Sequence, residues 1–368
     1  MILYINGNYP HHSLHGELVS KLADMGSEIT VFVPMSGTDL EGKYRCEHPH
    51  VRIIYSDCLQ KTDRIFFLSK IHRIAREIEK QVDLKIVDCI LTGTVYSDGG
   101  VAYLLNKKHG IPFSVAVRET DVTYQMQWRP YLNGFVKRLL SKASKIIFLS
   151  PAYKQFLARF KADQSKYTII PNSVHDDWFQ NQNKDRQLHT PLSLIFVGEI
   201  SARKNVGAII EVVAELKRRG IPTVFHIVGS GNEENNCKRL AEKLDVKKEV
   251  FFHGWQNGRE KIKAFYDQAD IFVMLSYRET FGTVYIEALS QGLPVIFTKG
   301  QGIDGYFEEN SVGYGCNPTN ILDVADKILM IKEHYIEMSK QCIHESSRFT
   351  WNRVADQYHD VISHMRKK

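Results

Sequence analysis

The chain has 368 residues, which is more than one ordinary hydrophobic core needs and predicts two domains. Hydrophobic residues make up 43% of the chain and charged residues 24%, which excludes an intrinsically disordered protein. The formal net charge is +6, and residues 1–172 hold 23 Lys and Arg against 16 Asp and Glu, so the positive excess lies in the first half. An excess of positive charge in one half of the chain favours an anionic partner, for example a membrane surface or a phosphate-bearing molecule.

No apolar run approaches the roughly 20 residues that a membrane-spanning helix needs. The apolar start, Met1–Ile5, is too short for a signal peptide, and Asn6-Gly7-Asn8 follows it directly. The six cysteines are widely spaced and form no Cys-x-x-Cys pair, which argues against a zinc site and a disulfide scaffold. These features predict a cytoplasmic protein, either soluble or peripheral at the inner face of the cell membrane.

The first elements in the chain form a strand–helix–strand unit. Residues 2–5 are an apolar strand, residues 18–25 have the spacing of an amphipathic helix that ends at Gly26, and residues 29–33 form the next strand. Such a unit predicts a right-handed crossover and a parallel sheet. Further strands are predicted at 51–54, 85–91, 113–117, 145–149 and 167–170.

The alternation of strands and helices is then interrupted and starts again. Residues 172–190 are polar and predict a linker. A second series of elements follows, and the chain ends in an amphipathic helix at 351–365. The second series comprises strands at 192–197, 224–228, 250–252, 271–275 and 294–298, with a helix at 206–219. Two doubly wound α/β domains are the natural interpretation, with ligands expected at the carboxyl ends of the strands.

One loop of the second half has the form of a phosphate site. It covers Ser276–Gly282, follows the strand 271–275 and precedes a helix that begins near Val284. The helix N-terminus therefore lies beside Phe281-Gly282-Thr283, where free backbone N–H groups and the helix dipole favour a phosphate. Gly282 allows close backbone approach.

Two glutamates flank this phosphate site. Glu279 lies in the loop, and Glu287 lies about one turn into the helix. Eight helical steps correspond to about 12 Å, which is the right order for two carboxylates that hold the sugar and the ribose of a nucleotide sugar. The alternative is that each is a solvated Glu near a helix start, where the dipole favours it.

The run from Glu279 to Gly292 closely resembles the E-x7-E signature of retaining GT-B glycosyltransferases. The likeness extends along the chain to the segments 169–174, 196–205, 228–231 and 252–254. It implies two Rossmann-like domains that face a central cleft. An acceptor-side domain is expected over 1–175 together with the C-terminal helix 352–368, and a donor-binding domain over 190–350.

The resemblance also assigns roles to residues of the donor half. Glu279 is expected to hold sugar hydroxyls, Glu287 the ribose, and the backbone of the phosphate site the diphosphate. Gly254 is expected near the nucleotide base. The leaving diphosphate needs a cation. The chain contains no Asp-x-Asp motif, so Arg203 and Lys204 are expected to replace a metal, and no cofactor is expected. The alternative for both is an exposed basic pair at a helix start.

In the first half the resemblance is weaker. Gly16 lies where the family has a glycine loop on the donor phosphate, or it belongs to a plain strand-to-helix turn. Arg118 occupies the position of the family's His beside the reacting sugar. Arg cannot act as a base at neutral pH, so Arg118 is expected to hold an anionic acceptor or the leaving phosphate. Asp121 is expected either to bind the acceptor or to cap a following helix.

Two basic, apolar stretches account for the charge of the first half, residues 64–82 and Trp128–Leu140. Both are suited to an anionic membrane interface, and both are equally compatible with helices packed on a core. Nucleic acid is not expected as a partner, since no binding motif is present.

The resulting hypothesis is a retaining, metal-independent transferase. It would move a hexose or N-acetylhexosamine from a UDP- or GDP-sugar to a hydroxyl of a lipid-linked or cell-surface polysaccharide acceptor. Two alternatives remain open, a sugar-nucleotide epimerase of the same architecture and a non-catalytic sugar-nucleotide-binding subunit. A dehydrogenase is disfavoured, because no Gly-x-Gly-x-x-Gly follows the first strand.

Overall fold

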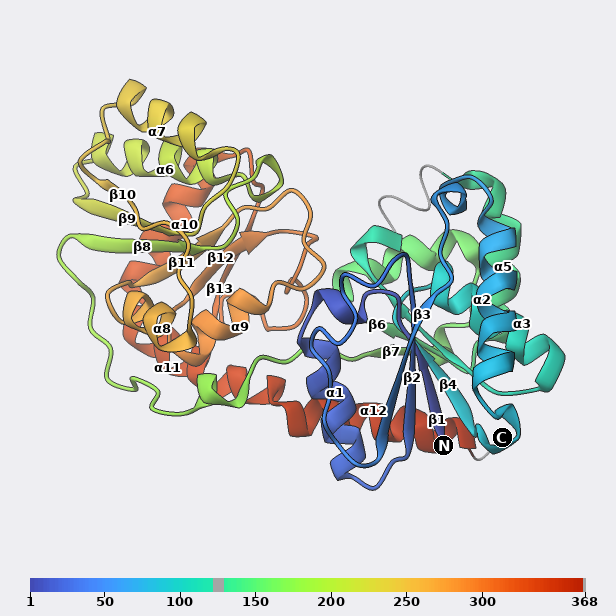
Figure 1. Cartoon of the computed structure of the whole chain (residues 1–368). Helices are drawn as coiled ribbons and strands as arrows, with labels where there is room; N and C mark the ends of the chain where they lie inside the picture. The colour runs from blue at the N-terminus through green and yellow to red at the C-terminus, as the bar shows by residue number, and fades with distance from the viewer. Residues whose placement is uncertain (122–128, 367–368) are drawn as a thin grey trace. The chain divides into compact units, whose positions relative to one another are not determined.

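The computed structural model describes residues 1–121 and 129–366 and divides into two compact units (Figure 1). Unit 1 comprises Met1–Leu149, Tyr153–Asn172 and Trp351–Lys368, and unit 2 comprises Ser150–Ala152 and Ser173–Thr350. Among the described helices, none is both long enough and apolar enough to cross a membrane.

Unit 1 is built on a parallel sheet in the order β3-β2-β1-β4, which a bridge between Ile90 and Phe113 links to β5-β6-β7. The strands are β1 (Ile2–Ile5), β2 (Ile29–Met35), β3 (Val51–Asp57), β4 (Cys89–Thr92), β5 (Ser114–Val117), β6 (Lys145–Phe148) and β7 (Tyr167–Ile169). β1 and β2 are buried along their whole length, which explains their continuous apolar runs. The strand order reverses between β1 and β4, where doubly wound sheets bind their ligands.

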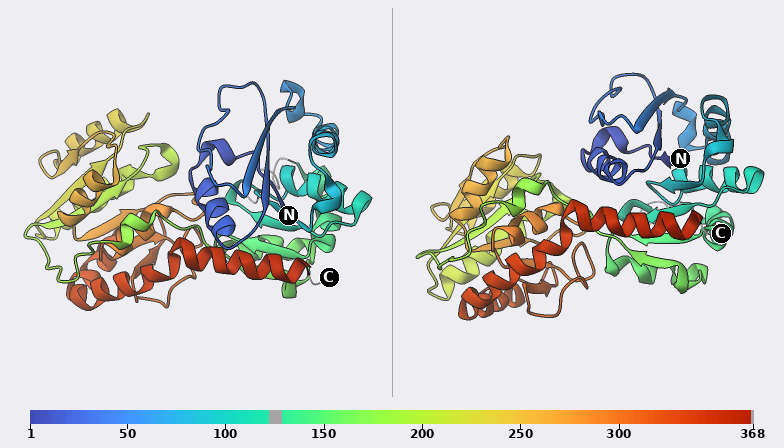
Figure 2. Two further views of the ribbon diagram at one scale, coloured as in Figure 1. Left: turned by 60° about the horizontal axis from the view of Figure 1, so that its bottom comes forward. Right: turned by 90° about the horizontal axis from the view of Figure 1, so that it is seen from below.

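Helices cover both faces of this sheet. On one face lie α2 (Phe67–Gln81), α3 (Ser97–His109) and α5 (Asn133–Lys142), which pack on one another. On the other face lie α1 (Leu14–Asp24) and the last helix, α12 (Trp351–Arg366), side by side (Figure 2). The predicted C-terminal helix therefore forms, and it completes the core of unit 1 through Trp351, Val354 and Ile362.

Unit 2 has one parallel sheet in the order β10-β9-β8-β11-β12-β13, with its reversal between β8 and β11. The strands are β8 (Leu192–Val197), β9 (Thr223–Val228), β10 (Val250–Phe252), β11 (Ile271–Met274), β12 (Val295–Thr298) and β13 (Gly313–Cys316). The helices are α6 (Val206–Arg218), α7 (Glu234–Lys243), α8 (Arg259–Asp267), α9 (Thr283–Ser290), α10 (Ile321–Glu333) and α11 (Tyr335–Ser346). Figure 1 shows α6 and α7 on one face and α8, α9 and α11 on the other.

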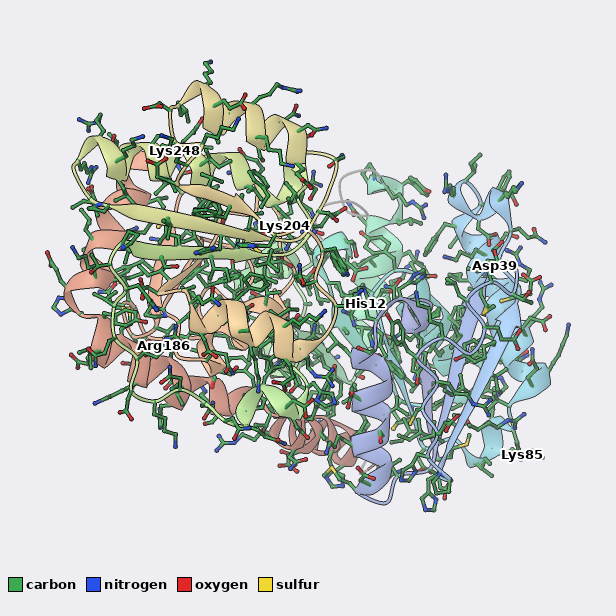
Figure 3. The ribbon with its side chains drawn as sticks, turned by 60° about the vertical axis from the view of Figure 1, so that its left-hand side comes forward. His12, Asp39, Lys85, Arg186, Lys204 and Lys248 are labelled. Atoms are coloured by element: carbon green, nitrogen blue, oxygen red, sulfur yellow. The ribbon has the colours of Figure 1, made fainter. Side chains whose placement is uncertain are left out.

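The polar segment 172–190, interpreted from sequence as a linker, packs on unit 2 instead. Trp178 is buried, and Arg186 is 4% exposed although it is charged (Figure 3). The Arg186 guanidinium donates to Tyr335 Oη at 3.2 Å, to the Gln291 carbonyl at 3.1 Å and to the Tyr266 carbonyl at 2.8 Å. A buried guanidinium is tolerated because these partners satisfy its donors.

Candidate active site

Glycine turns hold the strand ends of unit 2 close together. Gly198 N–H donates to the Val228 carbonyl at 3.0 Å, and Gly229 N–H donates to the Gly254 carbonyl at 2.9 Å. Gly229 has φ +148°, and a Cβ on it would lie 1.9 Å from the Gly198 carbonyl oxygen. Only glycine permits this close approach of the two backbones, so the carboxyl ends of β8, β9 and β10 pack closely against one another. Gly254 itself has open space around its Cβ position, which leaves room there for a ligand.

The strand reversal of unit 2 brings a buried cation and a carboxylate together. Lys204 ends a short 3-10 turn (Ala202–Lys204) ahead of α6, and Glu279 lies in the loop after β11. Lys204 is only 9% exposed, and its Nζ lies 2.5 Å from Glu279 Oε2 (Figure 3). Arg203 is more exposed, with Nη1 3.7 Å from the same oxygen and 2.9 Å from the Arg278 carbonyl. The structure therefore brings Arg203, Lys204 and Glu279 together, as the resemblance implies.

The loop after β12 positions Glu279, and the sequence interpretation missed it. Glu279 N–H donates to Gln301 Oε1 at 3.1 Å, and Gly302 N–H donates to the Glu279 carbonyl at 3.0 Å. The available signal was the glycine-rich run Gly300–Gly305 directly after an apolar strand, at the same sheet edge. Gln301 is thus a positioning residue for Glu279.

The N-terminus of α9 has the expected form of an anion site. Gly282, at the N-cap, has φ +78°, and a Cβ there would lie 2.7 Å from Tyr285 Cδ2, so glycine is required. Within residues 1–121 and 129–366, the backbone N–H groups of Phe281, Gly282 and Thr283 have no hydrogen-bond acceptor. The Phe281 side chain is buried and packs against Phe349, so only its backbone is left for a ligand.

Glu287 follows on α9 and is partly buried. Its carboxylate makes no hydrogen bond or ion pair with any residue that the structure describes. Burial raises the pKa of Glu287 to about 7, and the positive charge of Arg259, at the start of α8, opposes that rise. A partly buried carboxylate with no partner among the described residues is costly unless a ligand supplies one, as ribose hydroxyls would.

The predicted residues of unit 1 have different surroundings. Gly16 lies in the first turn of α1, and a Cβ on it would be 3.1 Å from the Tyr44 carbonyl oxygen, so close packing accounts for the glycine. Asp121 accepts N–H bonds from Arg118 at 3.0 Å, Val95 at 3.2 Å and Tyr96 at 3.4 Å. Asp121 therefore ties the loops after β4 and β5 together, and burial raises its pKa to about 6. Residues 122–128, which follow it, lie outside the described residues, so its predicted role as a helix cap stays a prediction.

Arg118 is anchored at the end of β5. Its Nε donates to the Gly93 carbonyl at 2.6 Å, and its charge, after burial, lowers the pKa of His12 and of His15. His15, next to Gly16 on α1, is buried, and its Nδ1 lies 3.1 Å from Tyr4 Oη. Most of the stretch 64–82 forms α2, which covers Phe67–Gln81. Trp128 of the second basic stretch lies outside the described residues.

Two protein-family models match the chain in succession. The model for Glycosyltransferase Family 4 matches residues 16–178, and the model for Glycosyl transferases group 1 matches residues 179–348. Among curated relatives, an uncharacterised glycosyltransferase of Methanocaldococcus jannaschii is 24% identical over 231 residues, which cover 58% of each chain. The alpha-monoglucosyldiacylglycerol synthase of Streptococcus pneumoniae is 26% identical over 247 residues, or 60% of this chain and 53% of that one. The matched stretch thus spans less than two thirds of the length of either relative.

Solved structures share the whole architecture. The sucrose-phosphate synthase of Thermosynechococcus elongatus superposes with a TM-score of 0.75 at 19% identity, covering 98% of both chains. HepE of Anabaena in complex with UDP superposes with a TM-score of 0.73 at 13% identity, covering 98% of this chain and 99% of that one. The chain belongs to the glycosyltransferases, with a family 4 first half and a group 1 second half, and its fold is GT-B.

Proposed function

We propose that this protein transfers a sugar from a UDP- or GDP-sugar to an acceptor hydroxyl, with retention at the anomeric carbon and without a metal. The observation that carries the proposal is the buried Lys204–Glu279 pair beside the uncapped N-terminus of α9 at the strand reversal of unit 2. The complex of HepE with UDP, a protein of the same fold, supports a uridine nucleotide as donor moiety.

Each donor-site group has a task that its chemistry suits. The Glu279 carboxylate accepts hydrogen bonds from sugar hydroxyls, and the Glu287 carboxylate accepts them from the ribose. Lys204, Arg203 and the N–H groups of residues 281–283 stabilise the negative charge that develops on the leaving diphosphate. In a front-face reaction the leaving phosphate takes the proton of the acceptor hydroxyl, so no protein nucleophile is needed.

Metal independence rests on the composition of the site. The chain has no Asp-x-Asp motif, and the described residues contain no group of three or more His, Cys, Asp or Glu placed to hold an ion. The cations Lys204 and Arg203 supply the positive charge instead.

A panel of UDP- and GDP-sugars tests the donor assignment by thermal unfolding. We expect one of the two nucleotide series to raise Tm. At a ligand concentration of 100 times Kd, binding adds about 2.7 kcal/mol to the free energy of unfolding. The same donor, incubated with a cell-derived acceptor pool and EDTA, should give a product whose anomeric configuration, read by NMR, matches the donor. Inverted product, or transfer abolished by EDTA and restored by a divalent cation, would refute retention or metal independence respectively.

We also propose that unit 1 docks on an anionic membrane surface, with a lipid-linked or polysaccharide acceptor. Ile65, Phe66 and Leu68, called here the α2 lip, are exposed by 73%, 60% and 50% at the start of α2. Lys61 and Arg64 are exposed directly before them. Apolar side chains beside cations are the composition of a membrane interface. The name of the pneumococcal relative, a synthase of a glycolipid, agrees with this proposal.

Vesicle sedimentation checks the α2 lip. Ile65→Ser combined with Phe66→Ser should weaken binding to phosphatidylglycerol vesicles at least about tenfold, since burying each side chain is worth about 1.5–3 kcal/mol. Ile86→Ser is the matched control, because Ile86 is 55% exposed elsewhere on unit 1. Equal binding by both variants, or no preference of the protein for phosphatidylglycerol over phosphatidylcholine, would contradict membrane docking through this lip.

A further inference from the structure

A cavity of about 750 Å³ opens in unit 1 where its strands end. Its lining comes from the segments that follow β1 to β5 and from the start of α2, so it lies at the carboxyl edge of the sheet, where doubly wound folds bind ligands. The cavity belongs wholly to unit 1 and is distinct from the donor-site groups of unit 2.

The cavity wall carries more positive than negative charge. Four cations line it: Lys61, Arg64, Lys70 and Arg129. Within the described part of the chain, none of these four has a carboxylate within salt-bridge distance. The two carboxylates of the wall are already engaged. Asp63 pairs with Arg73, and Asp121 accepts the three backbone N–H groups given above.

One of these cations is half-buried, and another is held in place before any ligand arrives. Lys70 lies on the first turn of α2, and its burial lowers its pKa, while Asp98 and Asp63 oppose that shift from beyond ion-pair distance. Arg129 lies over the Phe67 ring, 5.5 Å from its centroid, and its Nη2 donates to the Arg64 carbonyl at 2.9 Å. A half-buried ammonium that makes no ion pair with the described residues, beside a fixed guanidinium, favours the binding of an anion.

We propose that this cavity binds the acceptor through a phosphoryl group, which Lys70 and Arg129 hold while the acceptor hydroxyl is glycosylated. The inference rests on the proposed transferase function and specifies its acceptor class, a phosphorylated saccharide or a phospholipid-linked one. A phosphoryl group fits better than a neutral sugar because four cations on one wall, none paired with a described carboxylate, create a positive potential that attracts an anion of more than one charge. The hydroxyls of Thr94, Ser97 and Thr120 also line the cavity, and they can form hydrogen bonds with the other polar groups of the acceptor.

Thermal unfolding with saturating UDP and constant ionic strength tests the proposal, because UDP keeps phosphate out of the donor site. The ligands are inorganic phosphate, glucose 6-phosphate and glucose, and the variants are Lys70→Met, Arg129→Met and the control Lys85→Met. Lys85 is exposed and does not line the cavity (Figure 3). The wild type and Lys85→Met should be stabilised by both phosphates and not by glucose, whereas Lys70→Met should bind them about tenfold or more weakly.

A merely structural Lys70 would behave differently. If its role is to bind an anion, Lys70→Met without ligand should unfold at the same temperature as the wild type or higher, because an unpaired buried charge is removed. Sedimentation of the wild type and of Lys70→Met with phosphatidylcholine vesicles that contain phosphatidylinositol, or an equal amount of phosphatidylglycerol, then separates the sources. A response to glucose 6-phosphate alone indicates a soluble acceptor. Binding that is stronger with phosphatidylinositol than with phosphatidylglycerol, and is weakened by Lys70→Met, indicates a lipid-linked one. Both results support the proposal.

Three results would overturn it: unchanged phosphate affinity in both Lys70→Met and Arg129→Met, equal stabilisation by glucose and glucose 6-phosphate, or no phosphate response in the wild type. If UDP alone raises Tm in any of these cases, the donor proposal survives and only the acceptor class is lost. If UDP has no effect, the transferase proposal fails, and the assignment of this cavity to an acceptor fails with it.

Discussion

Lys204→Ala should lower kcat for sugar transfer by about 100- to 1000-fold, the usual cost of removing one preorganised group that stabilises charge in a transition state. Lys204 Nζ is buried and lies 2.5 Å from Glu279 Oε2, so both groups are already placed before the donor binds. Removing Lys204 takes away the buried cation of the site and leaves Glu279 with the more distant Arg203, 3.7 Å away. Arg203 is 45% exposed and further from Glu279, so Arg203→Ala should cost less.

Matched variants separate catalysis from folding. Breaking a largely buried ion pair from one side costs about 3–5 kcal/mol of stability, whereas removing both charges is close to neutral. Lys204→Met combined with Glu279→Gln should therefore recover most of the stability that Lys204→Met loses, without recovering kcat. Lys217→Ala, on α6 but paired with Glu249 at 3.0 Å, should keep wild-type kcat. The site assignment fails if folded Lys204→Ala transfers sugar within about threefold of the wild-type rate.

The strands that are buried on both faces could be predicted from the sequence, because burial on both faces requires a run of apolar residues, which is visible locally. β1 and β11 are continuous apolar runs, and β8 is apolar except for Ser193. The positions of the two glutamates could be predicted for the same reason. Glu279 and Glu287 lie on one continuous loop and helix, so their spacing is fixed by local geometry, while their roles at a donor site stay a prediction.

Features that depend on distant contacts could not be predicted. β13 reads Gly-Tyr-Gly-Cys, a poor strand former, and it forms by pairing with β12. Its Gly313 is required because a Cβ there would lie 1.9 Å from the Val295 carbonyl oxygen of β12. The polarity of segment 172–190 concealed Arg186, whose acceptors lie 80 or more residues away in sequence.

The role of Asp121 was missed for the same reason. Two of the N–H groups that it binds, those of Val95 and Tyr96, come from the loop after β4, more than twenty residues earlier in the chain. A carboxylate that ties two loops together has no spacing of its own in the sequence, so only the sheet order reveals it. The cavity in unit 1 likewise gathers cations from α2 and from beyond β5, and the sequence showed them only as an excess of charge in the first half.

Glu287→Gln should stabilise the protein at alkaline pH while it weakens donor binding. Burial raises the pKa of Glu287 from 4.5 to about 7, so the folded state holds this proton more tightly than the unfolded state. The stability that this proton contributes is complete below pH 4.5 and is lost as the pH rises through 7. Above pH 8 the ionised carboxylate costs the fold up to about 3 kcal/mol, at 1.36 kcal/mol for each pH unit between the two pKa values.

Denaturant unfolding across this pH range measures the effect directly. The free energy of unfolding of Glu287→Gln should exceed that of the wild type by up to about 3 kcal/mol at pH 8, and the difference should shrink towards zero as the pH falls to 4.5. Glu211→Gln is the control, because Glu211 is an exposed residue of α6, and it should change stability by less than about 0.5 kcal/mol.

A ligand-binding carboxylate is identified by two effects of opposite sign in Glu287→Gln, a gain in stability and a loss of donor affinity. Replacing a Glu that stabilises the fold would lower the stability of the protein. Glu287, with no partner among the described residues, instead destabilises the folded state until a ligand binds. Replacing it with Gln removes the charge that the ribose hydroxyls would meet, so Kd for UDP should rise about tenfold, the size of a hydrogen bond to a charged group. A less stable Glu287→Gln at pH 8, or unchanged UDP affinity, would show instead that the carboxylate is structural.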